Sequence, residues 1–149
     1  MSVKLEYSVV VERAVADVWA FMDDLDNYPE WVSGLDKAYQ LTAGPKDVGT
    51  RMAAVYIFLG RRLEIVSTVT EFEPLHTFGG AIDAGPLHIH SVVTYEAVSP
   101  HQTRITIALE GETGGVFKLA DPFVGRALYR QLEATYGNVK DVLEARILA

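Results

Sequence analysis

Hydrophobic and polar residues alternate through most of the chain, and they recur at helical spacing only near its two ends. From residue 50 onward, segments rich in β-branched and aromatic residues follow one another with short turn-like gaps. Gaps this short permit hairpins but not the crossovers of a parallel sheet, so the pattern predicts an antiparallel sheet. The expected strands cover residues 3–12, 36–42, 50–59, 62–72, 76–82, 87–98 and 104–110.

Between the first two expected strands, apolar residues at three-and-four spacing predict a short helix over residues 15–26. The sequence offers no Ser, Thr or Asn cap at its start, but Asp17 lies in the first turn, where the helix dipole favours a carboxylate. A second short helix is expected over residues 28–31, with Pro29 near its first position. The two helices would form a V-shaped support after the first strand.

The last third of the chain predicts one long amphipathic helix. Apolar residues recur there at helical spacing, at Val124, Leu128, Leu132, Tyr136, Val139 and Leu143. Pro122 favours a start near Asp121, which would leave residues 113–120 as a lid-like segment leading into the helix. A helix of about 30 residues would be ~45 Å long, whereas a strand of ten residues reaches only ~33 Å. The helix therefore has to lie across the sheet, and we expect the functional site in the gap between them.

The order of one strand, two short helices, six strands and a long helix predicts an α+β fold with the helices on one face of the sheet. A chain of 149 residues favours a single domain over residues 1–149. It contains no cysteine, which excludes disulfides and thiol chemistry and is consistent with a cytoplasmic location. The net charge of −7 argues against a nucleic-acid partner. No apolar stretch approaches 18 residues, so we expect no membrane-spanning segment.

Alternation along each strand assigns side chains to the face toward the long helix. Val69 and Phe72 both look buried but differ in parity, which predicts a bulge between them. The inner face could simply be core, but small residues among aromatics would leave room for a ligand. The residues expected to line such a cavity are Met52, Ala54, Tyr56, Phe58, Phe78, Ile89, Ser91, Val93, Tyr95, Ile107, Phe117, Ala120, Phe123, Val124 and Ala127.

Four segments carry a resemblance to a known superfamily. They are residues 14–19 (AVADVW) together with 24–31 (DLDNYPEW), 48–51 (VGTR), 69–74 (VTEFEP) and 136–144 (YGNVKDVLE). In this order and spacing the chain resembles the helix-grip (SRPBCC) superfamily, which includes START lipid-transfer domains, the birch-pollen allergen (Bet v 1-like) family and the polyketide cyclase/dehydrase family. The resemblance implies a curved seven-stranded antiparallel sheet wrapped around the C-terminal helix, with a pocket between them.

The resemblance leaves the function open, because a fold does not determine what its site does. We expect a carrier or sensor of a small hydrophobic molecule (lipid, aromatic or polyketide-like), acting as a monomer or homodimer. The alternative is a polyketide cyclase/dehydrase-type enzyme that catalyses aldol cyclisation and dehydration in the cavity. A weaker option is a partner-binding role for the exposed end of the long helix.

An enzyme would need an acid or base inside the cavity, with burial raising the pKa of a carboxyl group towards neutrality. The candidates by residue type and position are Glu64, Glu71, Asp83, His76, Tyr56 and Tyr95. Asp83 also fits a plain turn role in its Asp-Ala-Gly-Pro setting. His88 and His90 share one strand face and could grip a metal, but alternation points them outward. We therefore expect no metal and no cofactor.

Overall fold

The computed structural model describes residues 2–84, 87–113 and 122–146. In these ranges the elements follow the order β1 (Ser2–Val11), α1 (Val15–Asp23), η1 (Leu25–Asn27), α2 (Tyr28–Trp31), β2 (Leu35–Gln40), β3 (Arg51–Phe58), β4 (Arg61–Glu73), β5 (Thr77–Ala84), β6 (Leu87–Ser99), β7 (Gln102–Thr113) and α3 (Pro122–Ala145). This order confirms the predicted α+β fold.

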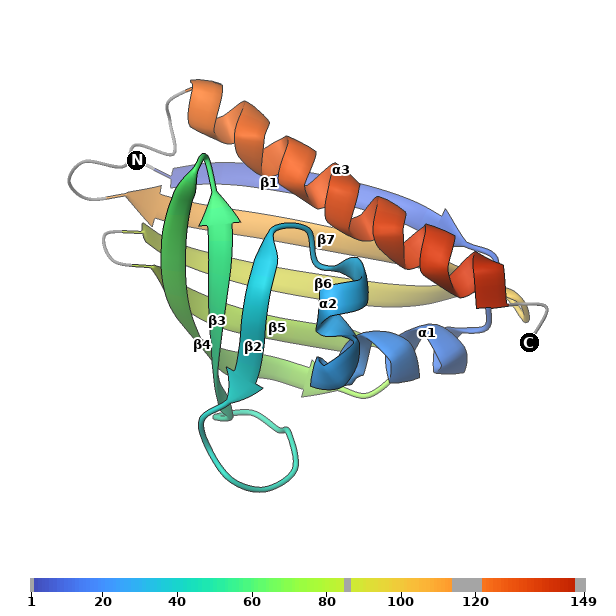
Figure 1. Cartoon of the computed structure of the whole chain (residues 1–149). Coiled ribbons are helices and arrows are strands. Elements are labelled where there is room, and N and C mark those ends of the chain that lie inside the picture. Colours follow the sequence, from blue (N-terminus) through green and yellow to red (C-terminus); the bar gives the residue numbers. More distant parts are fainter. Residues whose placement is uncertain (1, 85–86, 114–121, 147–149) are drawn as a thin grey trace.

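The strands form one antiparallel sheet of seven strands in the order β1-β7-β6-β5-β4-β3-β2. Because each hairpin pairs neighbours along the chain, only β1 is placed out of sequence, next to β7. Figure 1 shows the sheet curving so that α3 lies across its concave side, with α1 and α2 near one end of that helix. The predicted helix-grip arrangement is therefore confirmed.

Most element boundaries lie within a few residues of their predicted positions. The first helix is shorter than expected, since α1 ends at Asp23. There the side chain of Asp24 accepts a hydrogen bond of 2.9 Å from the Asp26 amide and begins the single 3₁₀ turn of η1. α3 begins at Pro122, as predicted, because a proline at the first helical position gives up an N–H that would have no partner anyway. Residues 114–120 of the expected lid-like segment lie outside the described residues.

The bulge predicted in the fourth strand is present. The pairing of β4 with β5 shifts register between Val69 and Glu71. The shift leaves one extra residue in β4. Because of it, Val69, which is 1% exposed, and Phe72 both face the interior. The ring of Phe72 packs against Trp19 of α1, with the ring centroids 5.8 Å apart. The bulge therefore helps to seat α1 on the sheet.

The interior is packed most tightly under the C-terminal half of α3. Val139 of α3 and Val18 of α1 are fully buried against Val11 of β1 and Ile105 of β7. At the same end the buried hydroxyl of Thr103 donates a 2.8 Å hydrogen bond to the Arg13 carbonyl oxygen. This bond gives a partner to a backbone carbonyl in the turn between β1 and α1. This end of the molecule is a conventional core, and it anchors α3 over the rest of the sheet.

Gly34 makes the tight connection from α2 to β2 possible. Its φ of +78° lies in the left-handed region, and a Cβ there would come within 2.9 Å of the Ile57 carbonyl oxygen. The Gly34 carbonyl oxygen accepts a 2.8 Å hydrogen bond from the Ile57 amide. The close approach holds the connection between α2 and β2 against the end of β3.

Candidate ligand-binding site

A cavity of about 280 Å³ lies between the concave face of the sheet and the helices. Strands β2 to β7 contribute side chains to it, as do α1, α2 and the middle of α3. On α3 its lining residues are Leu128, Gln131, Leu132, Thr135 and Tyr136, which repeat at helical spacing along one face. The same helix is therefore packed solidly at its C-terminal end and spans a cavity nearer its N-terminal end.

Small residues that pair across neighbouring strands leave the space that forms the cavity. Ala38 of β2 pairs with Ala54 of β3, and Gly80 of β5 pairs with Ser91 of β6. All of these residues line the cavity. Because their side chains are short, the sheet is hollowed where larger residues would reach α3.

Most of the predicted lining residues that can be checked do lie on the cavity. These are Met52, Ala54, Tyr56, Phe78, Ile89, Ser91, Val93, Tyr95 and Ile107. Ala127 does not line it and instead borders a second hollow with Ser33 and Ile57, because the neighbouring residues Leu128 and Gln131 occupy the inward face of α3. Phe117 and Ala120, and the side chains of Phe58, Phe123 and Val124, lie outside the described residues.

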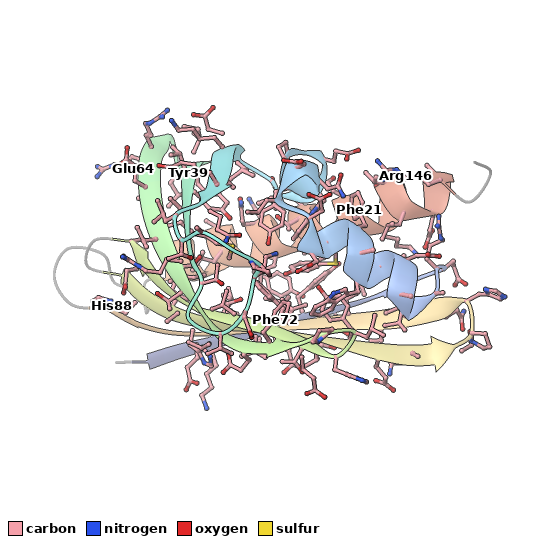
Figure 2. All side chains as sticks on the ribbon, turned by 90° about the horizontal axis from the view of Figure 1, so that it is seen from below. Phe21, Tyr39, Glu64, Phe72, His88 and Arg146 are labelled. Atoms are coloured by element: carbon pink, nitrogen blue, oxygen red, sulfur yellow. The ribbon has the colours of Figure 1, made fainter. Side chains whose placement is uncertain are left out.

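The structure does not bring the charged catalytic candidates to the cavity. Glu64 alternates with Leu63 and Ile65, which line the cavity, so it points to the convex side, where Figure 2 shows it. His76 is exposed in the turn before β5. Asp83 lies within β5 rather than in a turn, and it too is exposed. Parity along the strands thus places Glu64 and Asp83 on the side facing solvent, and His76 is exposed because it lies in a turn.

Two histidine–carboxylate pairs lie on that outer surface. The Nδ1 atom of His88 is 2.7 Å from a carboxylate oxygen of Asp83, and His90 Nε2 is 2.9 Å from Glu71. Partial burial raises the pKa of Glu71, but hydrogen bonds from Thr70 and His90 outweigh it, so the pKa lies below its ordinary value. Glu71 is therefore an anion at neutral pH and unsuited to donate a proton. Among the described residues, no three potential ligands gather around a common metal position.

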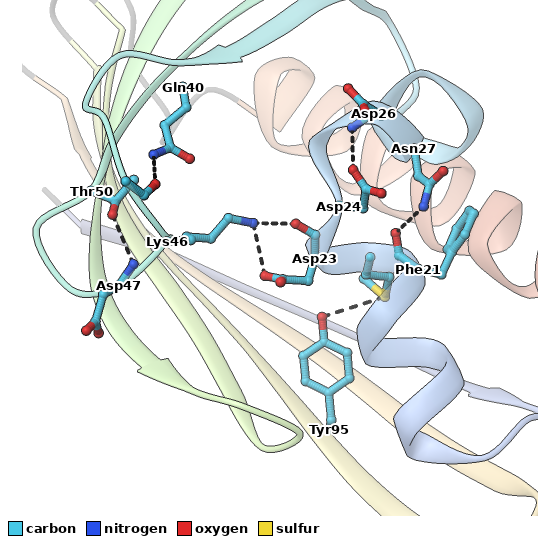
Figure 3. A network of polar contacts seen from close by, with 12 residues as sticks. Phe21, Asp23, Asp24, Asp26, Asn27, Gln40, Lys46, Asp47, Thr50 and Tyr95 are labelled. Atoms are coloured by element: carbon cyan, nitrogen blue, oxygen red, sulfur yellow. Dashed lines mark hydrogen bonds and ion pairs between the residues drawn. The ribbon is translucent and has the colours of Figure 1, made fainter.

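An ion pair that sequence reasoning missed lies at the edge of the cavity. Lys46, from the loop 41–50 between β2 and β3, places its Nζ 3.0 Å from the Asp23 Oδ1 atom at the end of α1 (Figure 3). The ammonium also donates to the Asp23 carbonyl oxygen and lies 5.2 Å from the ring centre of Phe78. In the sequence Lys46 sits among turn residues, where a lysine is usually solvated, so no local pattern indicates this contact.

Tyrosine side chains supply four of the other polar groups at the cavity. Tyr28, Tyr56, Tyr95 and Tyr136 all line the cavity. Burial raises the pKa of Tyr56 to about 12, and burial, with smaller contributions from neighbouring charges, raises the pKa of the other three tyrosines as well. At neutral pH these phenols are uncharged and can donate hydrogen bonds, but they cannot act as strong bases.

The site is thus an apolar cavity with uncharged hydroxyls and one ion pair at its edge. Such a combination of apolar walls and a few convergent polar groups is typical of sites for small organic molecules. None of the described helices combines the length and apolarity that crossing a bilayer would require.

Solved structures with this architecture span several kinds of protein. The Zhui aromatase/cyclase from Streptomyces sp. R1128 matches with a TM-score of 0.85 at 15% identity, covering 99% of this chain and 96% of that one. A START superfamily protein from Mycobacterium smegmatis matches with a TM-score of 0.81 at 12% identity, covering 95% and 97%. Ara h 8.0201 matches with a TM-score of 0.77 at 12% identity, covering 98% and 100%. At these identities the likeness shows the fold alone.

At the level of sequence, no curated protein shows a significant match to the chain. A family model described as polyketide cyclase/dehydrase and lipid transport matches residues 2–144. Because this match covers nearly the whole length, the chain belongs to the polyketide cyclase/dehydrase and lipid transport family.

Proposed function

We propose that the chain binds a small hydrophobic molecule, of lipid, aromatic or polyketide-like chemistry, in the cavity under α3. The observation that carries this proposal is the cavity of about 280 Å³ with its largely apolar lining. A dry apolar cavity of about 150 Å³ already admits benzene, so this one has room for a larger molecule. The family description, which includes lipid transport, supports the same proposal.

The cost of the cavity supports a binding role. Apolar side chains around an empty space lose the contacts that packing would give them, and this lowers the stability of the folded state. Longer side chains at Ala54 or Ser91 would recover those contacts, yet the sequence has small residues there. A ligand that fills the space would restore the lost contacts and stabilise the fold by mass action.

Native mass spectrometry of protein purified from its own cells tests the proposal. We expect one small apolar molecule per chain, released on denaturation and identifiable by its mass. The variant Ala54→Leu, purified in the same way, should carry less of it, because the longer side chain projects into the cavity. Equal occupancy in both proteins would place the molecule elsewhere and count against the cavity as its site.

A second candidate function is catalysis of aldol cyclisation and dehydration in the same cavity. It is favoured by Asp23 and Lys46, which are charged groups at the cavity, and by the likeness to an aromatase/cyclase. A base would remove a proton from the carbon between two carbonyl groups, and that carbon would attack a third carbonyl carbon. The resulting alkoxide would take up a proton, and water would then leave. Asp23 is the candidate base and Lys46 the candidate donor.

A short poly-β-ketone analogue separates the two candidates. A carrier returns the compound unchanged, whereas an enzyme releases a cyclic product that is lighter by one water, which mass spectrometry detects. With an enzyme, Asp23→Asn should slow formation of the product well below the wild-type rate while the compound still binds. If the product forms at the uncatalysed rate in the presence of wild-type protein, the catalytic candidate is excluded for that substrate.

A further inference from the structure

Lys46 is placed differently from the rest of its loop. Its side chain is only 9% exposed, whereas every other residue from 41 to 49 is exposed. A lysine on a surface loop ordinarily keeps its ammonium group in water, because burying a charge is costly unless it is paired. Here the side chain turns inward between the Phe78 and Tyr28 rings, 5.2 and 5.9 Å from their centres. It ends at the cavity that these rings help to line.

The pairing of Lys46 with Asp23 leaves hydrogen-bonding capacity on both partners. An ammonium has three N–H donors, and the carboxylate and carbonyl oxygens of Asp23 take two of them. Within the described part of the chain the third N–H has no hydrogen-bond partner, and neither does the Asp23 Oδ2 atom. Both residues line the cavity, so a bound molecule can meet a donor and an acceptor side by side.

We propose that the Asp23–Lys46 pair is the polar anchor of the cavity and selects an uncharged, hydroxyl-bearing molecule with an apolar, ring-sized body. This inference rests on the binding function proposed above and names the chemical class of its ligand. A hydroxyl is the group that matches the pair, because one oxygen can accept from Lys46 while its proton is donated to Asp23.

The charges of Asp23 and Lys46 disfavour a ligand that carries a carboxylate or an amine. The pair is neutral as a unit, and the tyrosine hydroxyls around the cavity are uncharged. A carboxylate on the ligand would be attracted to Lys46 but would lie against the like charge of Asp23, and an amine would meet the reverse problem. A molecule without any polar group would leave the free N–H of Lys46 facing hydrocarbon, which costs binding free energy.

Three probes with the same two-ring body test the selection at pH 7, where 2-naphthol is uncharged and 2-naphthoate is an anion. Dissociation constants for naphthalene, 2-naphthol and 2-naphthoate are measured by fluorescence titration on the full chain. We expect 2-naphthol to bind at least about tenfold more tightly than naphthalene, which corresponds to about 1.4 kcal/mol. The affinity for 2-naphthol should exceed the affinity for 2-naphthoate by a similar factor.

Two lysine variants assign the effect to the pair. Lys46→Met keeps a stem of similar length against the two rings but removes the N–H donors, so the preference for 2-naphthol over naphthalene should fall to about threefold or less. Lys37→Met, at an exposed position of β2, should keep the wild-type preference. Lys37→Met should bind naphthalene as the wild type does. Lys46→Met should bind naphthalene at least as tightly as the wild type, because no free N–H then faces the hydrocarbon, and this binding also shows that each protein is folded.

The possible results distinguish a failure of the polar anchor from a failure of the proposed binding function. If naphthalene and 2-naphthol bind with equal affinity, or if Lys46→Met keeps the preference, the polar anchor is wrong while the apolar cavity still stands. Tighter binding of 2-naphthoate than of 2-naphthol would also overturn it, because the site would then select anions. If none of the three probes binds, the proposed binding function fails and the anchor fails with it.

Discussion

At the scale of single residues, the cavity gets its character from side chains that are small, uncharged or paired. Ala54 and Ser91 leave the space. The tyrosines line it with hydroxyls that stay protonated at neutral pH, because burial disfavours the phenolate. Lys46, which is nearly buried, reaches it only together with Asp23. An apolar ligand therefore meets almost no unpaired charge. A polar ligand meets hydrogen-bonding groups near one edge of the cavity.

The raised pKa of Tyr56 predicts a loss of stability at alkaline pH. Tyrosine in the unfolded chain ionises near pH 10, whereas burial raises the pKa of Tyr56 to about 12 in the folded state. Between these values the unfolded chain holds fewer protons, so the contribution of Tyr56 is complete below pH 10 and is lost as pH rises. The expected loss is up to about 1.4 kcal/mol per pH unit.

The variant Tyr56→Phe lacks this ionisation. Urea unfolding of both proteins at pH 7, 8, 9, 10, 11 and 12 should give a free energy of unfolding that falls less steeply above pH 10 in the variant. Below pH 10 the difference between the two proteins should be constant. Parallel curves over the whole range would mean that Tyr56 ionises alike in the folded and unfolded states, contrary to its burial in the cavity wall.

Filling the cavity should separate binding from stability. Ala54→Leu adds apolar atoms where the structure has empty space, so we expect the free energy of unfolding to rise by about 0.5–2 kcal/mol. The affinity for naphthalene should fall at least about tenfold, because the ligand and the new side chain compete for the same volume. Ala108→Leu, at an exposed position on β7, is the matched control and should leave the affinity unchanged. Destabilisation by Ala54→Leu, with affinity intact, would show that no such space exists.

At the scale of elements, α3 has two ends with different roles. Its C-terminal half carries Val139 and Leu143, which are 0% and 2% exposed in the core shared with α1 and β1. Its N-terminal half presents Leu128 and Leu132 to the cavity. One helix can serve both roles because the sheet curves away from its straight axis (Figure 1). Anchoring is thus separated from binding along the length of a single element.

This division predicts that a core substitution in α3 changes stability without changing binding. Leu143→Ala should lower the free energy of unfolding by about 2–5 kcal/mol, measured by urea unfolding. Affinity for naphthalene should stay within about threefold of wild type under conditions where the variant is folded, since Leu143 does not line the cavity. Asp141→Ala, at an exposed position of the same helix, is the control for stability. A large loss of affinity in Leu143→Ala would mean that the two halves are coupled.

At the scale of the whole molecule, the features that could be predicted from the sequence are those that depend on the spacing of residues close together in the chain. The bulge follows from the parity of Val69 and Phe72, and the start of α3 follows from Pro122. The Asp23–Lys46 pair could not be predicted, because the loop and the end of α1 meet only after the chain has folded. Ala127 was assigned to the wrong hollow because the phase of a helix against its sheet depends on packing.

The space between α3 and the concave face of the sheet is where we propose that a small hydrophobic molecule binds. A crystal structure of the protein soaked with 2-naphthol would locate such a molecule. We expect density for the two rings between Ile107 of β7 and Leu132 of α3, with the hydroxyl toward Lys46. Side chains packed together in that space, or naphthol bound only on the outer surface, would show that the cavity is not a binding site.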